Sequence, residues 1–174
     1  ASFEEAAYLL WKGTLPTQAQ LDELNEQLRA ARPVHPDLLD HLRHHTPKDA
    51  NPMAAMRTAL SMLAAYDEEA DVMDPEANYR KAVRLTAKLP TLLAAFSRIR
   101  AGKDPVAPTQ TGSTAFDFLT MLNGEEPGPA ALQIMDAALV LHAEHGLNAS
   151  TFTARVISST LSDMYSAVVG AMGA

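Results

Sequence analysis

The stretch DPEANYRKAVRLTAKLPTLLAAFSRIRAG, residues 74–102, decides the fold class. Asp74 followed by Pro75 joins a good N-cap residue to the residue best tolerated at the first helical position. At the other end, Gly102 suits the left-handed conformation that commonly closes a helix. Apolar residues recur at helical spacing between these signals, which predicts one long helix to about Ala101. A kink is expected at Pro90, because proline supplies no backbone donor.

Similar signals before and after this helix predict an all-α protein. Few stretches combine strict alternation with β-branched residues, as a strand would. We therefore expect a single α-helical region over residues 1–174, interrupted by a loop over residues 104–112. The other expected helices cover residues 17–31, a short segment around 38–42, residues 51 to about 66, residues 113–123, a segment from 128 to about 145, and one from about 148 through Phe152, Val156, Ile157 and Leu161.

The composition excludes several classes of protein. The 174 residues contain no cysteine, which excludes disulfides, a thiolate nucleophile and cysteine-ligated metal centres, and which favours a cytoplasmic location. The net charge of -7 disfavours a dedicated nucleic-acid binder. No uncharged apolar run approaches the roughly 18 residues of a membrane span, so no membrane association is expected. The chain starts at Ala1 without methionine and stops inside an apolar pattern, which predicts a piece of a longer chain.

The segment HAEHGLNAST, residues 142–151, is the densest in chemistry-bearing side chains. His142 and His145 are three residues apart, which predicts that they share one helical face. The following helix begins at Asn148 or Ser150, and its free N–H groups favour an anion. Helix capping alone also explains these two polar residues. The spacing of the histidines does not fit a zinc-binding helix, so no metal is expected.

A basic stripe and an acidic turn form a second candidate. Arg80, Arg84 and Lys88 recur at four-residue steps on the long helix. Such a stripe meets a phosphate, an RNA or nearby acidic surface, and we favour the acidic surface. The acidic turn, residues 67–76, lacks the spacing of a calcium-binding loop and is interpreted as a solvated turn with a cap.

Several segments of the chain resemble citrate synthases and occur in the order found in that family. The most specific is LHAEHGLNAST, residues 141–151. The others are FEEAAYLLWKGTLPT (3–17), PKDANPM (47–53), AKLPT (87–91), IRAGK (99–103) and FLTMLNG (118–124).

The resemblance implies an all-α homodimer with a large and a small domain, in which oxaloacetate condenses with the acetyl group of acetyl-CoA to give citrate and CoA. This step belongs to the tricarboxylic acid cycle and needs no cofactor besides acetyl-CoA as substrate. Residues 1–174 would be part of the large domain, with the small domain absent. His145 resembles the histidine that binds oxaloacetate, with Asn148 and Ser150 as polar neighbours and His142 as a weaker member. The helix from Asn51 to Tyr66 resembles one at the dimer interface.

Two departures from the family pattern limit what the resemblance implies. Gly146 stands where many members carry an acidic residue. The Gly-Pro-x-His-Gly motif, whose histidine stabilises the enol of acetyl-CoA, would begin beyond Ala174, as would the catalytic aspartate. No catalytic residue is therefore expected within this chain. Two alternatives remain open, namely a 2-methylcitrate synthase that uses propionyl-CoA and a non-catalytic helical dimerisation or binding module.

Overall fold

The computed structural model describes residues 1–109 and 111–174, and Gln110, part of the expected loop, lies outside the described residues. Within the described ranges the backbone forms nine α-helices, one short π-helix and no strand, which confirms the all-α prediction. The helices are α1 (Phe3–Lys12), α2 (Gln18–Ala31), α3 (Pro36–Asp40), the π-helix η1 (His41–His45), α4 (Pro52–Ala64), α5 (Pro75–Arg100), α6 (Thr114–Asn123), α7 (Pro129–Ala143), α8 (Ala149–Ser159) and α9 (Met164–Gly173).

The helix starts follow the capping signals in the sequence. The Thr17 hydroxyl accepts a hydrogen bond from Gln20 N, and Gln20 Oε1 accepts one from Thr17 N at 2.9 Å, so α2 begins with a capping box. Asp74 Oδ1 accepts from Ala77 N at 2.9 Å and begins α5. These bonds satisfy backbone donors that helix starts leave free, which is why the starts were predictable.

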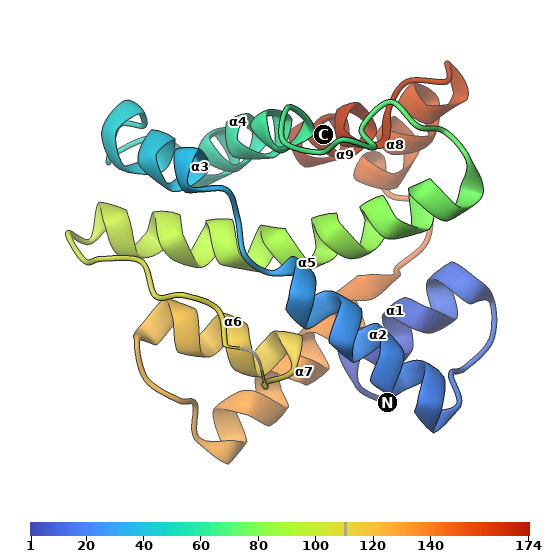
Figure 1. Ribbon diagram of the computed structural model, residues 1–174, viewed down its shortest axis with the longest axis horizontal. Helices are drawn as coiled ribbons and strands as arrows, with labels where there is room; N and C mark the ends of the chain where they lie inside the picture. Colours follow the sequence, from blue (N-terminus) through green and yellow to red (C-terminus); the bar gives the residue numbers. More distant parts are fainter. Residues whose placement is uncertain (110) are drawn as a thin grey trace.

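Helix α5 lies in the middle of the molecule and separates two groups of helices (Figure 1). On one side lie α3, α4, α8 and α9, and on the other lie α1, α2, α6 and α7. One core packs α4, α5 and α9 together through residues such as Leu60, Phe96 and Tyr165, each at most 3% exposed. A second core packs α2 against α5 through Leu24, Leu28, Val83 and Ala87. Helix α5 is therefore buried on two sides and runs unbroken through Pro90.

Two expected helix ends are wrong by a few residues. Helix α8 ends at Ser159, so Leu161 lies outside it, in a left-handed conformation with φ of 60°. This turn lets Asp163 cap α9 through Ser166 N at 2.9 Å. Helix α4 ends at Ala64, and Tyr66 lies in the turn beyond it, where its hydroxyl donates to Asp37 at 2.9 Å.

Helix α7 is largely apolar and α8 is amphipathic, but neither contributes a buried residue. Large side chains stay open to solvent, including Ile134 at 70%, Leu141 at 74% and Phe152 at 59% exposure. Exposed apolar surface of this extent is typical of a face that another part of a protein or a partner covers.

A buried polar cluster fixes the loop between α5 and α6. Arg32 and Asp117 are 3% and 1% exposed, and their charged groups lie 3.3 Å apart. Arg32 also donates to Gly112 O at 2.8 Å, and Asp117 accepts from Thr109 N at 2.6 Å. Beside them, buried Glu4 accepts from Thr114 N at 2.8 Å and joins α1 to the start of α6. Because Arg32 lies 80 positions from Gly112 and Glu4 lies 110 positions from Thr114, the cluster was not predicted.

Removing the buried carboxylate in Asp117→Ala is expected to lower the free energy of unfolding by about 3–5 kcal/mol, because Arg32 stays buried without its partner. Urea unfolding of the variant and the unaltered protein measures this difference. The control Glu125→Ala removes an exposed carboxylate from the α6–α7 loop and is expected to change stability by less than about 0.5 kcal/mol. Equal effects of the two substitutions would contradict the role of the buried pair.

Candidate functional site

The turn between α7 and α8 contains the predicted site and carries the chain from one group of helices to the other (Figure 1). Helix α7 ends at Ala143, and Glu144 is already extended, with φ of -152° and ψ of 130°. His142 therefore lies in the last turn of α7, whereas His145 lies outside the helix. The prediction that they share one helical face is wrong, because the helix ends between them.

Backbone and side-chain bonds hold this turn in one shape. Gly146 has φ of 89°, a left-handed conformation that glycine adopts without strain. Its N–H donates to Glu144 Oε1 at 2.5 Å, and Asn148 N donates to Gly146 O at 3.0 Å. The departure from the family pattern at Gly146 thus coincides with a backbone conformation that favours glycine.

The structure brings His145 and Asn148 together. Asn148 caps α8, since its Oδ1 accepts from Thr151 N at 2.8 Å, and its Nδ2 lies 3.0 Å from Nε2 of His145. His145 is exposed and Asn148 is half-buried. Ser150 lies in the first turn of α8, two residues beyond the cap, and is also half-buried. An imidazole and an amide thus lie at a helix N-terminus, where backbone N–H groups and the helix dipole favour an anionic ligand.

His142 is separate from this pair. Its Nδ1 lies 2.7 Å from Ala138 O, one turn earlier on α7. Because a carbonyl only accepts hydrogen bonds, Nδ1 carries a proton and donates it there. The side chain is thus bound to its own helix.

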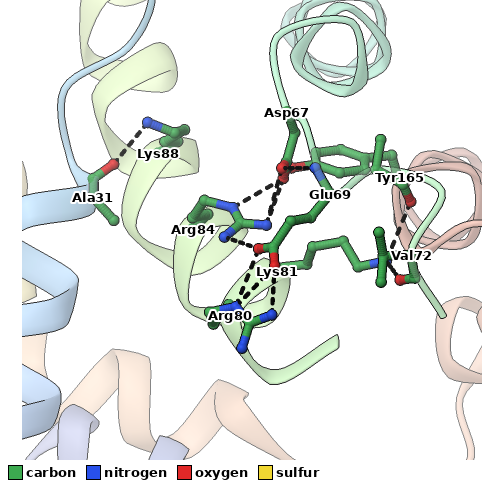
Figure 2. Close-up of polar contacts among 10 residues, drawn as sticks. Ala31, Asp67, Glu69, Val72, Arg80, Lys81, Arg84, Lys88 and Tyr165 are labelled. Atoms are coloured by element: carbon green, nitrogen blue, oxygen red, sulfur yellow. Dashed lines mark hydrogen bonds and ion pairs between the residues drawn. The ribbon is translucent and has the colours of Figure 1, made fainter. Parts of the chain in front are cut away.

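The basic stripe has its hydrogen-bond partners within the chain, and these are carboxylates for its two arginines (Figure 2). Arg84 bonds Asp67 at 2.9 Å and Glu69 at 2.8 Å, and Arg80 bonds the same Glu69 carboxylate. The Lys88 ammonium donates to the carbonyls of Ala31, at 2.9 Å, and Pro33. The prediction that the stripe meets the acidic turn is confirmed for Arg80 and Arg84 but not for Lys88. All three cations are already engaged, which weakens the alternative of a phosphate or RNA site.

The acidic turn is not fully solvated, and that part of its interpretation is wrong. The Asp67 side chain is 8% exposed, because it packs under Arg84 and accepts a hydrogen bond from the Tyr165 hydroxyl of α9. Burial by itself raises the pKa of Asp67, but the bonds from Tyr165, Glu69 N and Arg84 outweigh burial and lower it. Nearby, fully buried Lys81 donates to Ala70 O at 3.2 Å and Val72 O at 2.5 Å (Figure 2). Ion pairs and hydrogen bonds of several charged groups thus hold the segment before α5 against this helix.

Two further sequence expectations concern membranes and metals. Among the described residues, no helix has the length and apolar character needed to cross a membrane. Residues 1–109 and 111–174 also contain no group of three or more histidine, aspartate or glutamate side chains arranged to hold a metal ion.

The described residues define an all-α helical domain, and comparison with known proteins gives its family. The family model described as "Citrate synthase, C-terminal domain" matches residues 1–174. Citrate synthase 2 of Bacillus subtilis is 53% identical over 100% of this chain and 47% of its own length. The chain belongs to the citrate synthase family.

Two further comparisons concern substrate and fold. A 2-methylcitrate synthase of Mycobacterium tuberculosis is 46% identical over 99% of this chain and 43% of its own length. The solved citrate synthase of Thermoplasma acidophilum, a ternary complex with carboxymethyl coenzyme A and oxaloacetate, superposes with a TM-score of 0.94 at 25% identity. It is matched over 100% of this chain and 45% of its own. The chain thus spans about half the length of the curated relatives it matches.

The paired carboxylates predict a specific loss of stability in acid. Hydrogen bonds from Arg80 and Arg84 lower the pKa of Glu69 from 4.5 to about 2. The contribution of Glu69 to the free energy of unfolding is therefore complete above pH 4.5. It is lost as the pH falls toward 2, because the carboxylate is then protonated. Glu69→Gln is expected to flatten the pH dependence of the unfolding free energy in this window.

Urea unfolding at several pH values between 2 and 6 measures this dependence. The matched control is Glu68→Gln, which neutralises the adjacent, exposed carboxylate and is expected to leave the dependence in place. Asp67, whose pKa is also lowered, keeps part of the dependence in Glu69→Gln, so a dependence as steep as that of the unaltered protein would contradict the assignment.

Proposed function

We propose that the protein to which this chain belongs is a citrate synthase, which condenses oxaloacetate with the acetyl group of acetyl-CoA and releases citrate and CoA. The observation that carries the proposal is the turn at His145 and Asn148, within the motif LHAEHGLNAST, residues 141–151. The 53% identity to the Bacillus citrate synthase over the whole chain supports it. In this proposal residues 1–174 are part of the large domain.

In this proposal the residues of this chain bind oxaloacetate rather than the thioester. Oxaloacetate carries two carboxylates and a keto oxygen, all of which accept hydrogen bonds. His145 donates to one of these oxygens, and the N-terminus of α8 stabilises the negative charge. Asn148 and Ser150 complete the polar lining, and His142 supports the turn from α7.

The remaining chemical steps belong to groups outside this chain. Condensation needs a base that removes a methyl proton and a donor at the thioester oxygen. The enol then attacks the keto carbon, and hydrolysis of the citryl thioester releases CoA. We assign these roles to residues beyond Ala174, and the reaction requires no cofactor besides acetyl-CoA as substrate.

The cellular setting is part of the same proposal. The enzyme works in the cytoplasm, in the tricarboxylic acid cycle, as a homodimer assembled partly through α4. Ala55 and Ala59 of this helix are buried in the core of the chain, whereas Met53, at 49% exposure, and the partly exposed Ala54 are accessible to a partner helix.

Removal of the imidazole tests the oxaloacetate site. In the complete enzyme, His145→Ala is expected to lower kcat/KM for oxaloacetate by about 10²–10³, the usual effect of losing one aligned donor. His142→Ala is the matched control, with an expected loss well below tenfold because that ring bonds its own helix. Steady-state kinetics at saturating acetyl-CoA measure both values. Equal, small losses in the two variants would contradict the assignment.

A second candidate, 2-methylcitrate synthase, is favoured by the 46% identity to the Mycobacterium enzyme of that name. The two thioesters differ by one methylene, which an apolar pocket discriminates by about 10–200-fold. For a citrate synthase we expect kcat/KM for acetyl-CoA to exceed that for propionyl-CoA by at least about tenfold. A higher kcat/KM for propionyl-CoA than for acetyl-CoA would identify the protein as a 2-methylcitrate synthase instead.

A further inference from the structure

We infer that Gly170 of α9 is a positioning residue: its missing side chain lets α8 lie close against α9, and this spacing sets the distance between the turn of His145 and the chain that follows Ala174. The inference rests on the proposed function, which assigns the base and the thioester donor to residues beyond Ala174. It concerns where those groups meet oxaloacetate.

Helices α8 and α9 pack side by side as a helical hairpin (Figure 1). The connection between them, residues 160–163, is short, and short connections join antiparallel helices. Leu161, with φ of 60°, turns the chain, and Asp163 begins α9 by accepting from Ser166 N at 2.9 Å. The two helices have 11 and 10 residues and run in opposite directions, so the end of α9 lies beside the start of α8.

Gly170 lies at a close contact between the two helices. A methyl group at this position would lie 2.2 Å from Cδ1 of Ile157 and 3.4 Å from Cγ2 of Thr153, both on α8. Carbon atoms do not approach each other to 2.2 Å, so a larger residue requires a shift. The backbone gives no other reason for glycine, because Gly170 lies inside α9 without a positive φ, and glycine weakens a helix relative to alanine. Close packing against α8 is therefore what this glycine provides.

This contact determines what lies beside the proposed oxaloacetate site. Gly170 faces the middle of α8 and is about one turn from the end of α9. The last turn of α9 therefore lies beside the first turn of α8, where Asn148 and Ser150 are. The chain beyond Ala174 starts next to the site, at a distance that the packing of α8 on α9 sets.

Helix α8 is the one that moves when the contact is enlarged. Helix α9 is anchored in the core, because Tyr165 is 3% exposed and its hydroxyl donates to Asp67. Helix α8 contributes no buried residue. A side chain at Gly170 is therefore expected to push α8 outward, together with the turn of His145 at its start. A misplacement of about 1 Å is enough to lower a rate by about 10²-fold.

Two substitutions in the complete enzyme test this contact. Gly170→Ala adds the methyl group that meets Ile157. Ile157→Val removes Cδ1 alone, the atom in the way, and leaves Cγ2 of Thr153 at an ordinary contact distance of 3.4 Å. The matched control is Gly173→Ala, which adds the same methyl group to the same helix, where the nearest atom, Cδ of Arg57, is 3.6 Å away.

Steady-state kinetics, expressed per folded enzyme, give kcat and KM for oxaloacetate. Gly170→Ala is expected to lower kcat by about 10-fold to 100-fold and to change this KM by less than about threefold, because oxaloacetate moves with its turn. Adding Ile157→Val to Gly170→Ala is expected to restore kcat to within about threefold of the unaltered enzyme. Gly173→Ala and Ile157→Val alone are expected to change neither value.

The outcomes distinguish this inference from the proposed function. An unchanged kcat in Gly170→Ala, or a loss that Ile157→Val does not restore, would overturn the positioning role, while formation of citrate by the unaltered enzyme would keep the citrate synthase assignment. An unaltered enzyme that forms no citrate would overturn the proposed function. Urea unfolding would then still test the contact, since Ile157→Val is expected to raise the unfolding midpoint of Gly170→Ala but not that of the unaltered protein.

Discussion

Helix α5 is buried on two opposite sides, and both cores of the molecule are built on it. A helix of 26 residues in this position must present apolar side chains to α4 and α9 on one side and to α2 on the other. Its N-terminal half also carries basic residues that a core does not accept unpaired. The segment before α5 meets this requirement, because Asp67 and Glu69 pair with Arg84 and Arg80, and its carbonyls receive Lys81 (Figure 2). Because its basic residues are paired, α5 can pack in both cores.

The candidate site depends on this scaffold indirectly. Helix α7 packs with α1 and α6 on one side of α5, and α8 packs with α9 on the other, so the turn between α7 and α8 joins the two groups (Figure 1). Within the turn, Gly146 supplies the left-handed backbone and Asn148 supplies the helix start. A histidine placed between two anchored helices has little freedom to move, which suits a residue that must meet a small substrate in one orientation.

The predictable and unpredictable parts of the structure differ in the range of the interactions that cause them. Thr17, Asn51 and Asp74 mark helix starts through bonds to backbone groups two or three residues away, and all three starts were predicted. The pairing of the basic stripe with the acidic turn also followed from nearby sequence. The pair of Arg32 and Asp117 was missed, because those residues are 85 positions apart and look like ordinary surface charges in sequence. At the site, the residue types were recognised, but the helix end between His142 and His145 was not, since no proline marks it and Gly146 lies three residues beyond the last helical residue.

The proposed function depends on binding of oxaloacetate at the turn of His145. A crystal structure of the complete enzyme with oxaloacetate bound would show whether this contact exists. We predict an oxygen of oxaloacetate at hydrogen-bond distance, about 2.7–3.2 Å, from a ring nitrogen of His145, with Asn148 still in contact with the ring. Oxaloacetate bound elsewhere, with His145 free of it, would contradict the claim.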